Sequence, residues 1–484
     1  CVDQLPACGW HATGSVLRLE NMTSNPVTFN PRVPDLATEF IGSIFNDYDP
    51  REYAPGADFL TRQEDRKKVS PSAIPAVGRP LTEATKELVD VLEHDSNLRH
   101  PRFFGFIPGP AQSVSWLGDV IATAYNPHAS NWAQSPGASA LEKQVLDWAC
   151  EAVGISAPNR GGILVSGGSM ANLTGLMAAR ESRIDLDEIP LARIYTTEQT
   201  HSSVNKALRI IGVRPRILPV DEHFRMQPDI LRKAIVEDRA KGLKPLAVVG
   251  TCGTTNTGAI DPLDAIADIC DEFGLWFHVD GAYGGSVVLS SHKDDAHGVE
   301  RCDSMAWDGH KWLFQTYGLA MLLVKDRTDL VRAFSAGGEY LQDVEGGSQN
   351  PDWWDMGPEL TRPARAPRLW LTLQTVGTER LTQMIDSSIA VAELFEKEIA
   401  AVDGISIVTS ACNAIVTFTT GSEERNVQLA EYLRRHNIAG IWTTTLNDKN
   451  VLRLCTISPD ETPEDMEALV KDIRQALEVI PTRS

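Results

Sequence analysis

The sequence predicts an α/β fold: a large domain with a mainly parallel seven-stranded sheet, followed by a smaller α+β domain. Between about residues 150 and 330, short runs rich in Val, Ile and Leu alternate with helical segments. This alternation is typical of a parallel sheet covered by helices on both faces. After about residue 390 the β-rich runs follow one another closely, which indicates a separate antiparallel sheet. At 484 residues, the chain is long enough for more than one domain.

The elements follow in order along the chain. An amphipathic helix is expected over 81–97. The predicted strands of the large sheet are GGILVS (161–166), ARIYTT (192–197), PRILPV (215–220), LAVVGT (246–251), LWFHVD (275–280), DSMAWD (303–308) and LAMLLV (319–324). Those of the small sheet are ISIVTS (405–410), AIVTFTT (414–420), AGIWTTTL (439–446) and VLRLCTI (451–457), before a closing helix from about residue 462.

These elements suggest a division of the chain. Residues 1–22 read as a tag or disordered arm without chemistry, and residues 23–110 as an N-terminal arm that packs on a second copy of the chain. Residues 111–389 would form the large domain, and residues 390–484 the small one.

Charge and composition exclude several classes of partner. The chain has 45 basic and 65 acidic residues, a net charge of -20, which repels nucleic acid and anionic lipid surfaces. No apolar run approaches the roughly 20 residues of a membrane-spanning helix. The eight cysteines show no C-x-x-C spacing, so we expect buried thiols in a cytoplasmic, reducing compartment.

A glycine-rich turn is the first candidate for chemistry. In VSGGSMAN (165–172), Gly167 and Gly168 permit close backbone approach, and the following helix amides and the Ser169 hydroxyl can hold an anion such as phosphate. The segment is neither a Walker loop nor a dinucleotide fingerprint. Alone it is weak evidence.

Three further residues follow predicted strands. Asp280 ends a strand in FHVDGAYGGS, where an ordinary helix cap is the alternative. His201 could stack on a ring or move protons, although a solvated loop histidine is the commoner explanation. Thr251, at the end of another strand, could reach a ligand oxygen.

Lys311, in DGHKW, admits three interpretations: a surface charge, a phosphate clamp or a nucleophilic amine. A metal site at Asp308 and His310 would lack a third ligand, so we predict no metal. The order of glycine-rich turn, histidine, threonine, strand-end aspartate and lysine decides among the three. A phosphate cradle, a stacking group, a carboxylate for a ring nitrogen and an amine for an imine together describe a pyridoxal 5'-phosphate site.

The chain resembles the group II decarboxylases of the aspartate-aminotransferase fold (fold type I of pyridoxal phosphate enzymes), the family of aromatic-L-amino-acid decarboxylase. The resemblance rests on motifs spread over residues 80–480. They include HPRFFGFIPGP, NWAQSPGASALEKQVLDW, GGILVSGGSMANLTGLMAARES, QTHSSVNKA, GTTNTGAIDPL, WFHVDGAYGG, DGHKW and WDMGPELTRPAR. FIPGPAQSVSWLGD and DMGPELTRPAR are most similar to the bacterial branch that includes tryptophan decarboxylases.

Carried over position by position, the resemblance implies the roles of the site residues. Lys311 would attach the cofactor covalently, Asp280 would bind its pyridinium nitrogen, and His201 would stack on its ring opposite Ala282. Further cofactor contacts would come from Gly167, Gly168, Ser169, Thr251, Asp308 and His310. Thr361 aligns with a phosphate-side residue that a partner subunit donates in family dimers, so we expect a homodimer with shared sites.

The resemblance also implies a reaction. In the family, a loop tyrosine from the partner protonates the carbanion, and Tyr340 takes that place here. Relatives that form aldehydes tend to replace this tyrosine or the histidine at 201, so having both favours simple decarboxylation. The presumed substrate wall comprises Phe103, Phe106, Ile107, Pro108, His128, Ser130 and Trp132. Aromatic walls suit an aromatic amino acid, although Phe103 could equally be core packing.

Alternatives remain open at this point. A decarboxylase of glutamate, aspartate or cysteine sulfinate would need a basic residue facing the substrate side chain, and the segment FFGFIPGPAQS offers none beyond Arg102. An aminotransferase would bind the α-carboxylate firmly, which opposes its departure. A non-catalytic cofactor-binding regulator would be expected to carry a DNA-binding appendage, for which the chain has no basic domain.

Overall fold

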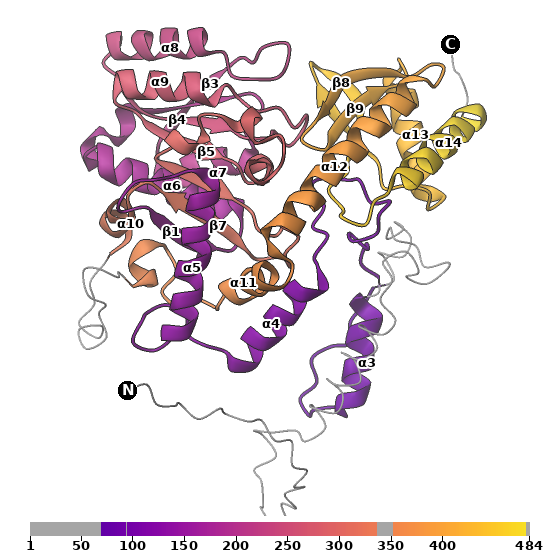
Figure 1. Cartoon of the computed structure of the whole chain (residues 1–484), viewed down its shortest axis with the longest axis horizontal. Helices are drawn as coiled ribbons and strands as arrows, with labels where there is room; N and C mark the ends of the chain where they lie inside the picture. The colour runs from indigo at the N-terminus through magenta and orange to yellow at the C-terminus, as the bar shows by residue number, and fades with distance from the viewer. Residues whose placement is uncertain (1–68, 93, 336–351, 481–484) are drawn as a thin grey trace, which may run out of the picture.

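The computed structural model describes residues 69–92, 94–335 and 352–480 and contains two sheets (Figure 1). The larger has seven strands in the order β1-β7-β6-β5-β4-β2-β3. These strands are β1 (Gly161–Val165), β2 (Ala192–Thr197), β3 (Arg214–Leu218), β4 (Lys244–Thr251), β5 (Trp276–Asp280), β6 (Ser304–Trp307) and β7 (Ala320–Val324). Only β7 runs against its neighbours, β1 and β6, so the prediction of a mainly parallel seven-stranded sheet is confirmed.

Helices connect and cover these strands. Those before and within the large sheet are α3 (Leu81–Leu92), α4 (Ser113–Tyr125), α5 (Pro136–Val153), α6 (Gly168–Arg183), α7 (Ser202–Ile211), α8 (Pro228–Ala240), α9 (Leu263–Phe273) and α10 (Arg327–Phe334). Short 3-10 turns are η1 (Leu186–Leu191), η2 (Gly284–Leu289), η3 (Lys293–Ala296), η4 (Val299–Arg301) and η6 (Trp353–Met356). Helix α6 packs along β4, β5, β6 and β7. Strands β1, β5, β6 and β7 are buried throughout, which explains why most of their residues are apolar.

The second sheet is antiparallel, with the order β10-β11-β9-β8. Its strands are β8 (Ser406–Cys412), β9 (Ile415–Thr419), β10 (Trp442–Leu446) and β11 (Lys449–Cys455). Helices α11 (Ala366–Thr375) and α12 (Gly377–Ala400) lead to it, and α13 (Glu423–Arg435) and α14 (Pro463–Val479) follow. Figure 1 shows α12 reaching from the large sheet to the small one. We propose that the large domain ends at residue 389 and the small domain begins at residue 390, within α12.

Two elements are at least three residues shorter than the sequence predicts. Strand β10 begins at Trp442 rather than at residue 439 because Gly440 bonds to another segment: its N–H donates to Arg102 O, and its O accepts from Phe104 N. Helix α3 ends at Leu92, and none of its residues is buried. Within the described ranges, no helix combines the length and apolar character needed to cross a bilayer.

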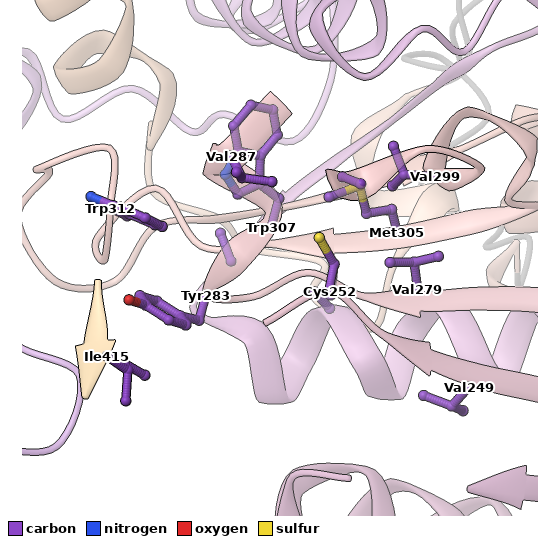
Figure 2. Close-up of a cluster of buried hydrophobic side chains, with 14 of the residues drawn as sticks. Val249, Cys252, Val279, Tyr283, Val287, Val299, Met305, Trp307, Trp312 and Ile415 are labelled. Carbon is purple, nitrogen blue, oxygen red and sulfur yellow. The ribbon is translucent and has the colours of Figure 1, made fainter. Parts of the chain in front are cut away.

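An aromatic stack joins the two sheets next to the strand ends (Figure 2). Tyr283, which follows β5, stacks on Trp312 with ring centroids 5.3 Å apart, and Figure 2 shows it facing Ile415 of β9. The Tyr283 hydroxyl donates to Asn413 O at the start of β9. Burial raises the pKa of this phenol, so it stays a neutral donor. The loops that follow β5 and β6 are thereby held against the small sheet.

Candidate active site

A cavity of about 580 Å³ opens at the carboxyl ends of the parallel strands, where open α/β sheets bind ligands. The structure brings most of the predicted cofactor contacts together in its lining. These are Gly167, Gly168, Ser169, His201, Thr251, Asp280, Ala282, Asp308, His310 and Lys311. They come from five loops, each of which follows a strand of the large sheet, namely β1, β2, β4, β5 and β6.

The glycine-rich turn is built for close packing. Gly168 is the first residue of α6, and a Cβ atom there would lie 2.8 Å from Ala282 Cβ and 3.0 Å from Asp308 Oδ2. Any larger residue would push the turn away from these neighbours. The glycine thus lets the α6 N-terminus, with its free amides, face the cavity where an anion would be stabilised.

Asp280 is a buried carboxylate held by donors. Its Oδ2 accepts from Asn172 Nδ2 at 3.0 Å, and its Oδ1 accepts from the Ala282 N–H at 3.2 Å. The side chain is only 5% exposed. These two hydrogen bonds hold the carboxyl group in one orientation at the edge of the cavity.

Lys311 is paired inside the cavity rather than exposed as a surface charge. Its Nζ lies 2.9 Å from Asp308 Oδ2, and Asp308 is only 2% exposed. His310 Nε2 lies 3.7 Å from the same oxygen, and His310 Nδ1 is 2.7 Å from Leu319 O. Because burial lowers the pKa of His310, its neutral ring donates through Nδ1 and leaves Nε2 as an acceptor. Among the described residues, the Lys311 amine is therefore the group paired with Asp308.

His201 caps the N-terminus of α7. Its Nδ1 accepts from the Ser203 N–H at 3.3 Å and lies 2.8 Å from Ser203 Oγ. Desolvation by the surrounding protein lowers the pKa of His201, against an opposing effect of Asp280. The ring is therefore a neutral group at neutral pH.

Thr251 offers a hydroxyl with no hydrogen-bond partner in the described part of the chain, and its Oγ1 is buried. Its main-chain N–H donates to Asp261 Oδ2 at 2.7 Å, and burial raises the pKa of Asp261 to about 6. Asp308 Oδ1 is likewise buried without a partner. Unsatisfied buried polar atoms are rare. Together with the helix N-terminus and the Lys311 amine, these atoms fit a phosphorylated pyridine aldehyde.

The predicted substrate wall at 103–108 does not line this cavity. Phe103 is 2% exposed and packs on Trp442, with ring centroids 5.2 Å apart, which favours the core-packing alternative. Phe106 is 64% exposed, has φ 56° and also contacts the Trp442 ring. Ile107 is half-buried and Pro108 is buried. Their substrate role stays a prediction.

A second set of predicted residues gathers elsewhere in the chain. His128 Nε2 lies 3.4 Å from Thr361 Oγ1, and Ser130 Oγ accepts from the Arg362 N–H at 3.2 Å. Trp132 stacks on Trp353. None of these residues lines the cavity of its own chain. Tyr340 lies outside the described residues.

Several lining residues were missed by the sequence reading. They include Met170, Leu173, Gln199, Ser203, Lys206 and Ile210. Leu173 is four residues after Ser169 on α6, and Lys206 and Ile210 are three and seven residues after Ser203 on α7, so helical spacing from Ser169 and Ser203 could have found these three. Asn172, in the motif VSGGSMAN, donates a hydrogen bond to Asp280 and does not itself line the cavity.

Comparison with known proteins agrees with this geometry. Residues 64–420 match the family model described as the pyridoxal-dependent decarboxylase conserved domain. An aromatic-L-amino-acid decarboxylase of Bacillus atrophaeus is 35% identical over 415 residues, covering 82% of this chain and 86% of that protein.

Solved structures of similar fold include decarboxylases with different names. Catharanthus roseus tryptophan decarboxylase in complex with L-tryptophan has a TM-score of 0.82 and 27% identity, covering 93% of this chain and 100% of that one. The glutamate decarboxylase domain of a Vibrio parahaemolyticus protein has a TM-score of 0.79 and 26% identity, covering 93% and 95%. With its lysine, aspartate and glycine-rich turn at one sheet edge, the chain belongs to the pyridoxal-dependent decarboxylases, fold type I enzymes that use pyridoxal 5'-phosphate.

Proposed function

We propose that this decarboxylase acts on an aromatic L-amino acid and releases the arylalkylamine and CO2. The observation that carries the proposal is the cavity wall: Met170, Leu173 and Ile210 are apolar, and no arginine is among the described residues that line it. An apolar wall suits a flat side chain, whereas an acidic side chain needs a paired cation. The two lysines among the described lining residues are Lys311, which is paired with Asp308, and Lys206, which is exposed on α7. The bacterial relative's name supports the same substrate class.

The site residues would divide the work as follows. Pyridoxal 5'-phosphate, when bound, supplies an electron sink for the pair left by cleavage of the bond to the carboxylate. Gly168, Ser169 and the α6 N-terminus would hold its phosphate, and the Asp280 carboxylate would keep the ring nitrogen protonated. Lys311 would attach the cofactor covalently. To react as a nucleophile the amine must lose a proton, and Asp308 Oδ2, 2.9 Å away, is placed to hold that proton.

We further propose that the enzyme is a homodimer with shared sites. Thr361, which the resemblance assigns to a partner's site, lies with the predicted substrate-wall residues His128 and Ser130, away from the cavity of their own chain. Helix α3 has no buried residue, and α4 exposes Leu117 and Ile121. Mixing Lys311→Ala with Thr361→Trp chains tests this: a mixed dimer with one intact site should regain activity. Failure of a mixed dimer to do so would contradict shared sites.

The substrate is tested by a panel assay. The cofactor-loaded protein is incubated separately with each of the twenty amino acids, dopa and 5-hydroxytryptophan, and products are identified by mass. We expect tryptamine, phenylethylamine, tyramine or their hydroxylated forms. Consumption of glutamate, aspartate or cysteine sulfinate alone would overturn the aromatic assignment.

One observation is a reason to include acidic amino acids in the panel assay. Arg102 pairs with Asp472 at 2.6 Å, so it is not free to meet a substrate. Arg453, however, donates through Nε to the O of Thr255, which lines the cavity, and its Nη2 is buried with no partner in the described chain. If the panel favours acidic substrates, Arg453→Leu should abolish their turnover.

Changing Tyr340 to phenylalanine is expected to alter the product. Tyr340 aligns with the family's proton donor, and without that phenol a positioned acid worth roughly 10²- to 10⁴-fold is lost. Amine formation should fall and carbonyl product, with ammonia and peroxide, should rise under oxygen. The two products are separated by mass spectrometry, with Tyr125→Phe, an exposed tyrosine on α4, as the matched control. An unchanged ratio of amine to carbonyl would remove Tyr340 from the protonation step.

A further inference from the structure

A continuous series of buried hydrogen bonds, here called the hydrogen-bond chain, leads from Trp276 to Asp280. Trp276, His278 and Asp280 alternate along β5 and so share one face of the strand. Trp276 Nε1 donates to Ser304 Oγ at 2.8 Å, and Ser304 Oγ lies 2.7 Å from His278 Nδ1. His278 Nε2 lies 2.9 Å from Asn172 Oδ1, and Asn172 Nδ2 donates to Asp280 Oδ2 at 3.0 Å. None of these side chains is more than 5% exposed.

The two ends of the chain fix the direction of every bond. An indole N–H can only donate, and an ionised carboxylate can only accept. The Asn172 amide must therefore turn its NH2 to Asp280 and its oxygen to His278, so His278 carries a proton on Nε2. Burial lowers the pKa of His278 to about 4, so the ring is neutral and Nδ1 accepts the Ser304 hydroxyl proton. All donors point toward the cavity.

A branch of this hydrogen-bond chain reaches His201. Asn172 Nδ2 also donates to Ser203 Oγ at 3.2 Å, and that oxygen lies 2.8 Å from His201 Nδ1. The Ser203 main-chain N–H, which can only donate, points to the same ring nitrogen at 3.3 Å. His201 Nδ1 is thus an acceptor, and the neutral ring keeps its proton on Nε2.

We infer that Asn172 is a positioning residue that couples Asp280 to His201, and that the chain behind it fixes His278 and His201 as Nε2–H tautomers. The inference rests on the proposed roles of Asp280 and His201 and deepens them. Donors on both oxygens fix the Asp280 carboxylate in place. His201 can offer a hydrogen bond through Nε2 but cannot take up a proton there. A site without a base at that atom favours loss of CO2 over removal of the substrate's Cα proton.

Nuclear magnetic resonance of the holoenzyme labelled with ¹⁵N-histidine tests the tautomers. The chain has 11 histidines, and the two signals are assigned by their loss in His278→Gln and His201→Gln. We expect both rings to be neutral with the proton on Nε2 at neutral pH. A proton on Nδ1 of either ring would overturn the inference.

The coupling is tested with Asn172→Ala. We expect the signals of both histidines to move, although residue 172 does not contact the His201 ring, and kcat to fall about 10- to 100-fold with little change in KM. Thr174→Val is the matched control, because Thr174 is buried on the same helix and its hydroxyl has no partner in the described chain. Its spectrum and kinetics should match the wild type. An unmoved His201 signal or an unchanged kcat would contradict the coupling.

Ser304→Ala covers the case in which the Asn172 variant fails to fold. It leaves the contacts of Asp280 intact and removes only the hydroxyl between Trp276 and His278. We expect the His278 Nδ1 signal to move because its hydrogen bond is lost, while the proton stays on Nε2, where Asn172 Oδ1 still accepts it. A proton on Nδ1 in this variant would contradict the directional chain. If the enzyme proves to act on acidic amino acids, the substrate proposal fails while these signals are unaffected, so the two failures are distinguishable.

Discussion

Replacing Lys311 by alanine is expected to abolish covalent attachment of the cofactor and to lower turnover by at least about 10²- to 10⁴-fold, the range for a positioned proton-transfer group. Lys311 Nζ is inside the cavity, 2.9 Å from Asp308, and no other lysine in the described part of the chain pairs with Asp308. Borohydride reduction of the holoenzyme followed by peptide mapping should label Lys311 in the wild type. The variant should show no label and no imine absorbance.

Lys206→Ala is the matched control for this experiment. Lys206 is the other lysine in the lining of the described cavity, but it is exposed and stands on the second turn of α7. Its removal should leave the label on Lys311. Retention of a label in Lys311→Ala, or its transfer to Lys206, would mean that the attachment site is wrong and with it the assignment of the cavity.

The large sheet could be predicted from the sequence because its strands carry their own signal. Central strands buried on both faces are largely apolar, and LAMLLV, for example, contains the whole of β7. The strand-end loops of such a sheet meet at one edge, so residues up to about 140 positions apart, such as Gly168 and Lys311, could be expected together. The rule that ligands bind at the carboxyl ends of parallel strands predicts this grouping, which the local sequence pattern alone does not.

The substrate wall could not be predicted in the same way. Whether Phe103 faces a ligand or the core depends on Trp442, a residue of the small sheet far along the chain. His128 and Thr361 contact each other rather than the cavity, and their placement against a partner depends on an assembly that one sequence does not describe. Asn172 was missed for a related reason: its neighbours come from α7 and β5, and only packing brings them together.

Replacement of Asp280, which this packing holds in place, is the second change expected to have a large effect. Asp280→Ala should bind the cofactor but lose about 10²- to 10³-fold in kcat, since ~2.7 to 4 kcal/mol is typical for one preorganised electrostatic group. The loss should fall on kcat because the charge at the ring nitrogen matters most when electrons flow toward it. Absorbance spectra report cofactor binding, and single-turnover kinetics report the chemical step.

A matched control separates the loss of this charge from the loss of any buried carboxylate. Asp238 on α8 is also buried, accepts a hydrogen bond from the Tyr195 hydroxyl at 3.1 Å, and does not line the cavity. Asp238→Asn should therefore leave the chemical step unchanged even if it lowers stability. If Asp280→Ala holds the cofactor and turns over at a near-normal rate, the protonated ring nitrogen is not what drives decarboxylation here. The donors on Asp280 would then serve only to satisfy a buried charge, as the bond from Tyr195 does for Asp238.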